Sequence, residues 1–149
     1  MRTIKKAVLC CVAMLCLLLS SCGKALDLTL DGHIWRFTVV QAGENGEIVA
    51  CSADKKVSYE DAEVVELACE AQDGSLTLSR KDTGESLTMA CEIYSENAES
   101  AIYSLWTDEQ SGLATIGVTT YQNGGSEYTL IVVLGEYTLY FTETISDGK

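Results

Sequence analysis

The sequence of 149 residues contains no proline and only one histidine, His33. The absence of proline excludes a Pro-rich linker and a PxxP recognition motif. A Ser-His-Asp or Cys-His arrangement needs an imidazole beside a nucleophile. His33 follows Gly32 at the start of an extended segment, where we expect a surface or rim position. The sequence therefore predicts a protein that is not an enzyme, with no catalytic residues.

Basic residues are scarce as well. Ten Lys and Arg face 22 Asp and Glu, and three of the ten lie in the first 21 residues, where no acidic residue occurs. Without that segment, seven basic and 22 acidic residues leave a net charge of −15. Nucleic-acid binding requires a basic face, so nucleic acid is excluded as a partner. Such a charge serves solubility, or it steers a cationic partner toward the surface.

No apolar run is long enough to span a bilayer, which needs about 20 residues. The longest covers residues 7–19, all apolar or Cys, after a basic start with Arg2, Lys5 and Lys6. Polar residues and Gly23 follow at once. This order is typical of a secretory signal segment rather than of a retained membrane helix.

The sequence Leu19-Ser20-Ser21-Cys22 resembles the lipobox that the bacterial lipoprotein signal peptidase cleaves. The resemblance implies that Cys22 becomes a lipidated N-terminus and that the chain is held at the cell membrane, on its extracytoplasmic face. We then expect a signal peptide over residues 1–21 and a short tether over 22–31. A β-barrel domain should follow over 32–144, with a C-terminal tail over 145–149.

Three cysteines remain after Cys22, and an odd number leaves at least one unpaired within the chain. The spacing of Cys51, Cys69 and Cys91 matches no zinc-binding motif, and the chain has only one His that could complete a set of zinc ligands. We therefore expect no metal site and no cofactor. A hairpin turn at 73–74 would pair Cys69 with Leu78, and Leu78 with Leu87, which leaves Cys91 too far from Cys69 for a disulfide. A bridge between Cys51 and Cys69 stays open at this point.

From residue 33 onward, short β-rich runs alternate with turn signals, which is typical of an antiparallel barrel or sandwich. The fold class predicted is all-β, a small up-and-down β-barrel of about eight or nine strands. The expected strands cover residues 33–41, 48–51, 64–72, 76–79, 87–94, 102–107, 114–121, 128–134 and 137–142.

Some local details are more specific. In the first strand Trp35, Phe37 and Val39 are expected on one face. Asp73-Gly74 is typical of a two-residue hairpin turn, although residues 64–72 could instead continue a helix. Ser58 and Asp61 indicate a short helix near 58–63. In the last hairpin, around Gly135-Glu136, the register pairs Leu134 with Tyr137, Val132 with Leu139, and Leu130 with Phe141.

Three segments carry a further resemblance: residues 31–35, the 73–78 hairpin and the 119–141 tail. Together they look like small lipocalin-like (calycin) lipoproteins of Gram-positive bacteria. The resemblance implies a barrel and suggests a small apolar ligand inside it.

Small barrels use inward aromatic residues either to fill the core or to line a cavity. We expect six aromatic residues to face inward, and all of them except Tyr137 are candidates for a ligand cavity. The candidates are Trp35, Phe37, Trp106, Tyr128 and Phe141. The alternative function is a protein-interaction or inhibitor module, with an acidic surface for a basic extracellular partner such as a cell-wall hydrolase.

Overall fold

A computed structural model describes residues 26–145 of the chain. Cys22, the segment 1–21 and most of the 145–149 tail lie outside the described residues. The described part has ten strands and one short 3₁₀ helix, and none of its helices has the length and apolar character needed to cross a membrane. The elements are β1 (Arg36–Ala42), β2 (Glu47–Cys51), η1 (Ala53–Lys55), β3 (Glu63–Val64), β4 (Leu67–Gln72), β5 (Ser75–Arg80), β6 (Ser86–Glu96), β7 (Ser100–Trp106), β8 (Ser111–Thr120), β9 (Ser126–Leu134) and β10 (Tyr137–Thr144).

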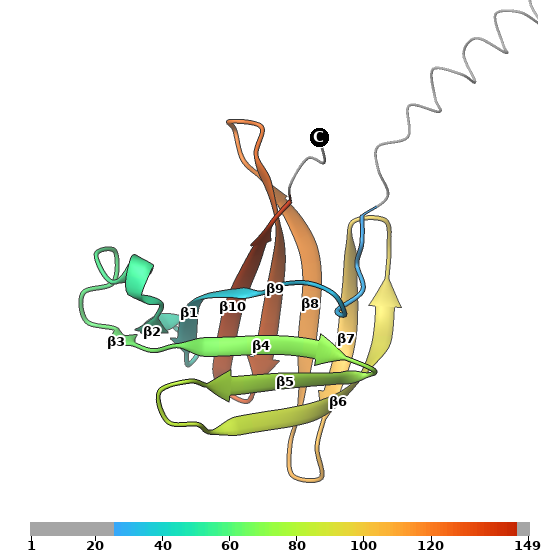
Figure 1. Cartoon of the computed structure of the whole chain (residues 1–149), viewed down its shortest axis with the longest axis horizontal. Helices are drawn as coiled ribbons and strands as arrows, with labels where there is room; N and C mark the ends of the chain where they lie inside the picture. Colours follow the sequence, from blue (N-terminus) through green and yellow to red (C-terminus); the bar gives the residue numbers. More distant parts are fainter. Residues whose placement is uncertain (1–25, 146–149) are drawn as a thin grey trace, which may run out of the picture.

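All ten strands belong to one sheet in the order β3-β2-β1-β10-β9-β8-β7-β6-β5-β4. The pairs are antiparallel except for the short parallel pair of β2 and β3. The sheet curls into a half-barrel around a single core, with β4 to β6 crossing in front of β7 to β10 (Figure 1). The all-β prediction is confirmed. The expected strands are present, except that the one expected over 64–72 is interrupted at residues 65–66 and divided between β3 and β4.

The barrel has an open seam between the two edges of the sheet, β3 and β4. The chain crosses the seam directly, because only two residues separate these strands. Two backbone bonds support the crossing: Val65 N–H donates to Cys51 O at 3.0 Å, and Lys81 N–H donates to Glu66 O at 2.9 Å. Beside this crossing, β1 lies against β4. We refer below to the region between β1 and β4 as the seam.

The hairpins expected from the sequence form in the expected register. Leu134 pairs with Tyr137, Val132 with Leu139, and Leu130 with Phe141. Residues 67–72 form a strand and not a helix, so the strand alternative for this region is confirmed. Asp73 and Gly74 have φ of 50° and 76°, the left-handed conformation that this two-residue turn requires.

One face assignment in the first strand is wrong. Trp35 and Phe37 are buried as expected, but the next core residue is Val40 and not Val39. The reason is a register shift between Phe37 and Val39, where β1 pairs with β10. A bulge inserts one residue and moves every later side chain to the other face, so simple alternation fails here.

The short helix expected at 58–63 is also wrong. In its place the chain forms a series of turns between η1 and β3. The Lys56 ammonium donates to the backbone oxygens of Glu60 at 2.6 Å and Ala62 at 2.7 Å. These bonds satisfy carbonyl groups outside any helix, and the buried Ala62 anchors the loop against the domain. The chain is then free to enter β3 directly.

Candidate functional site

The interior of the half-barrel is occupied by apolar side chains. Phe141, Leu76, Met89, Leu105, Ile116, Leu130 and Val132 are fully buried. Phe37 packs on Phe141 with ring centroids 5.8 Å apart. No polar or charged residue of the described chain belongs to the buried set. Among the candidate cavity residues, Trp35, Phe37 and Phe141 are therefore core residues, and Tyr128 is half-buried against the same core.

Trp106 does not join the other aromatic candidates. It is 42% exposed at the end of β7, because Leu105 takes the inward position beside it. Tyr137, also expected in the core, is 45% exposed next to the β9–β10 turn. Both residues end or begin a strand beside a turn, where alternation no longer guarantees cover by a neighbouring strand.

His33 closes the end of the barrel where the chain enters it. Its ring lies between Trp35 and Tyr128, with centroid distances of 4.8 Å and 4.7 Å. Nδ1 contacts the Glu143 carboxylate, and Nε2 lies 3.2 Å from the backbone oxygen of Asp27. The side chain is only 6% exposed, so of the two expected positions, surface or rim, His33 takes the rim. Both ring nitrogens are engaged, which leaves neither free to act as a base.

The segment before β1 is fixed to the same end of the barrel. Asp27 N–H donates to the Tyr128 hydroxyl at 2.9 Å, and the Tyr103 hydroxyl donates to Leu28 O at 2.9 Å. A side-chain hydrogen bond from Thr29 lowers the pKa of Asp27, which keeps that carboxylate charged. We call residues 27–33 the clamped segment. Its role was not predicted from the sequence, because its contacts join residues up to 110 positions apart.

A shallow hollow of about 400 Å³ follows the seam. Trp35, Phe37 and Leu67 contribute to its apolar lining, and Arg36 and Lys81 contribute cationic groups. The indole Nε1 of Trp35 is buried and has no hydrogen-bond partner. An unpaired buried donor costs about 1–3 kcal/mol, and this nitrogen is shielded from the hollow by the surrounding side chains.

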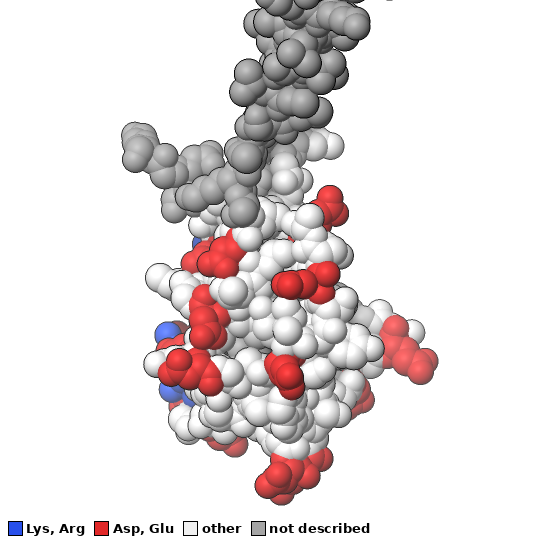
Figure 2. Space-filling view, turned by 90° about the vertical axis from the view of Figure 1, so that its right-hand side faces the viewer, with Lys and Arg blue, Asp and Glu red and all other residues white. Residues whose placement is uncertain are grey.

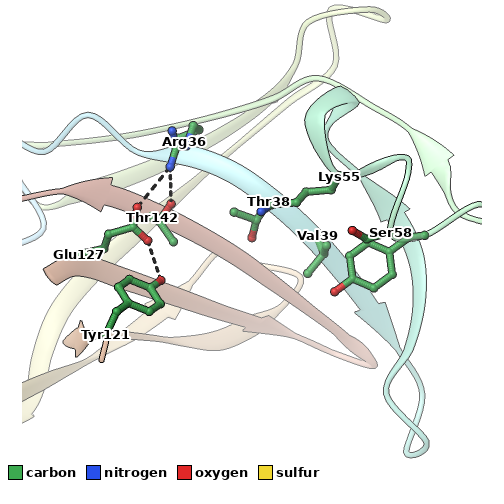
Figure 3. A pocket seen from close by; sticks show the side chains of 9 residues that line it. Arg36, Thr38, Val39, Lys55, Ser58, Tyr121, Glu127 and Thr142 are labelled. Atoms are coloured by element: carbon green, nitrogen blue, oxygen red, sulfur yellow. Dashed lines mark hydrogen bonds and ion pairs between the residues drawn. The ribbon is translucent and has the colours of Figure 1, made fainter. Parts of the chain in front are cut away.

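A second hollow, of about 350 Å³, lies between β1, the η1 loop and the ends of β8 to β10 (Figure 3). The Arg36 guanidinium donates to Glu127 at 3.3 Å and to Thr142 at 3.5 Å. The Tyr121 hydroxyl donates to Glu127 at 2.8 Å, and this bond raises the pKa of Tyr121. The polar groups on this wall satisfy one another, while Lys55 stands on the opposite wall.

The three described cysteines are free thiols, so the Cys51–Cys69 bridge is not formed. Cys51 and Cys69 are buried, and burial raises the pKa of Cys69 to about 12. Burial also raises the pKa of the half-buried Cys91. Only the thiolate is nucleophilic, so these environments disfavour reactive cysteine chemistry. Within residues 26–145, no group of three His, Cys, Asp or Glu side chains is arranged to hold a metal ion.

Charge is distributed unevenly over the surface. The described residues carry 21 acidic and five basic side chains. The five are Arg36, Lys55, Lys56, Arg80 and Lys81, and three of them line the two hollows beside β1. Residues 82–145, which include β6 to β10, hold ten acidic side chains and no basic one. Figure 2 shows acidic groups spread over one face, with basic groups only at its left margin.

No protein family, curated protein or solved structure matches the chain. Its function is therefore inferred from the geometry and charge described above.

Proposed function

We propose that this chain is a membrane-anchored extracytoplasmic lipoprotein, held by a lipid on Cys22, whose β domain is a non-enzymatic binding module for a basic protein. The observation that carries the proposal is the one-sided charge. Ten acidic side chains and no basic one occur across residues 82–145, over five consecutive strands. Such a field raises the association rate with a cationic partner by factors of 10 to about 10³.

The filled core supports a surface function over a ligand carried inside the barrel. Fully buried apolar side chains occupy the space that a calyx would need. Three of the five residues considered for a cavity are part of this packing. Partner recognition is therefore assigned to the outer surface.

The clamped segment determines which end of the barrel a lipid on Cys22 would hold near the membrane. Asp27 is five residues after Cys22, a distance along the chain that can extend at most about 18 Å. Because Asp27 is bonded to Tyr128, a lipid on Cys22 would hold this end of the barrel close to the membrane. The β7–β8 and β9–β10 turns lie at the other end (Figure 1) and would face away from it.

A small apolar ligand remains the second candidate, and one observation favours it. The seam hollow combines an apolar lining with the cationic groups of Arg36 and Lys81. A molecule with an apolar body and a hydrogen-bond acceptor would suit these groups. The seam, and not the barrel interior, is the place for such a ligand.

Native mass spectrometry of the full chain, extracted from its membrane in mild detergent, separates these functions. We expect the mass of a diacylglyceryl group on Cys22, together with a basic protein that dissociates as salt is raised, since salt screens surface charge. A small adduct lost on denaturation would favour the seam ligand instead. A chain that carries the lipid but no partner of either kind would contradict both functions. A Cys22→Ala chain, which should leave the membrane fraction, is the control for the anchor.

A further inference from the structure

The outer face of the sheet carries an apolar patch at the end of the barrel opposite the clamped segment. Leu113 on β8 and Val133 on β9 are direct cross-strand partners. Trp106 on β7 pairs with Ser111, two residues before Leu113, and such diagonal neighbours are within reach of an aromatic side chain. Trp106 is 42% exposed, Leu113 is 45% exposed and Val133 is 39% exposed. We call them the distal patch.

Acidic residues flank the distal patch at the turn end of its strands and on the side of β6. Asp108 and Glu109 form the β7–β8 turn directly after Trp106, and Glu136 lies in the β9–β10 turn after Val133. Glu92 on β6 pairs with Ser104, which itself pairs with Leu113. Residues 82–145 offer no Lys or Arg that could neutralise this rim.

We infer that the distal patch and its acidic rim form the docking surface for the basic protein partner; this inference rests on the proposed function. An exposed Trp beside two aliphatic side chains is the composition of an interface centre, where Trp is enriched. A charged rim around an apolar centre sets the rate and specificity of association. The position of the patch, away from the anchored end, leaves it open to a protein approaching from outside.

The acidic rim disfavours two other occupants of this surface, a second copy of the chain and a lipid membrane. A second copy of the chain would place one acidic rim against another, and like charges juxtaposed at an interface cost several kcal/mol. A lipid surface with anionic headgroups would be repelled in the same way. Only a basic protein gains from both the apolar centre and the acidic rim.

The test is site-specific photo-crosslinking of the full chain in the cells that produce it. A benzoylphenylalanine photoprobe replaces Leu113 in one variant and Val57 in the control. Val57 is 90% exposed and follows Lys55 and Lys56 in the loop after η1. We expect a crosslinked protein of basic composition at position 113 and none at position 57. Neutralising the rim with Asp108→Asn, Glu109→Gln and Glu136→Gln should lower the yield at position 113 by about tenfold.

The possible outcomes distinguish an error in the docking surface from an error in the proposed protein-binding function. A protein crosslinked at position 57 but not at 113 would overturn the distal patch and leave a protein-binding function standing. No protein at either position would contradict both. An acidic partner at 113, or a yield that the rim variant leaves unchanged, would overturn the charge argument. The three rim residues lie on exposed turns, so their substitution leaves the fold intact.

Discussion

At the scale of single residues, burial decides what each polar group can do. Cys69 is buried on β4 opposite Leu78, in the inward position that the alternating pattern predicts. His33 differs, because its place at the start of an extended segment suggested exposure. In the structure its ring fills the barrel end between two aromatic side chains. A single histidine thus has a structural role that only its distant partners, Glu143 and Tyr128, reveal.

The buried thiol predicts a specific loss of stability at alkaline pH. The pKa of Cys69 is raised from 9.0 to about 12 in the folded chain, so the unfolded state loses its proton first. The contribution is fully present below pH 9 and is lost as the pH rises toward 12. In urea unfolding across this range, Cys69→Ala should show a shallower decline in the free energy of unfolding than the unsubstituted chain. An equal decline in both would contradict the burial of this thiol.

At the scale of elements, the β-hairpins follow from local sequence and the bulge in β1 does not. Turn residues such as Asp73-Gly74 fix the register of their own hairpin, and the alternation of the two strands then follows. The register of β1 against β10 joins segments about 100 residues apart. A bulge there depends on the closure of the sheet, which no local pattern describes.

The two glycines inside strand β8 make a matched pair for testing the packing of the sheet. A Cβ at Gly112 would lie 2.3 Å from the backbone oxygen of Val133, whereas one at Gly117 would meet Glu99 O at 3.6 Å. Gly112→Ala should therefore destabilise the domain by about 1–3 kcal/mol. Gly117→Ala should be neutral, or stabilising by up to about 1 kcal/mol. Chemical denaturation of both variants measures the difference, and equal effects would contradict the close approach of β8 to β9 at Gly112.

At the scale of the whole molecule, the acidic charge that we propose for partner recognition opposes folding. The described residues hold 21 acidic side chains against five basic ones, and the compact state brings these like charges together. Self-repulsion of this kind destabilises a folded protein. The proposed partner would relieve it at the distal patch.

Salt should accordingly stabilise this domain. Raising ionic strength with NaCl screens exposed charges, and we expect the free energy of unfolding to increase by roughly 1 kcal/mol or more. KCl at the same ionic strength should act equally, because screening does not depend on which monovalent cation is present. Thermal unfolding followed by circular dichroism gives the measurement. A midpoint that falls or stays constant with salt would show that ion pairs such as Arg80–Glu63 outweigh the repulsion.

The all-β class, most strands, the hairpin registers and the excess of acidic residues could be predicted from the sequence, because each depends on local alternation, turn chemistry or composition. The tertiary structure was needed to establish that Trp106 is exposed while Phe37 and Phe141 meet in the core. It was also needed to place the clamped segment and the distal patch at opposite ends of the barrel (Figure 1). The physical reason is that curling a sheet brings together strands far apart in the chain, and their contacts are absent from any local pattern.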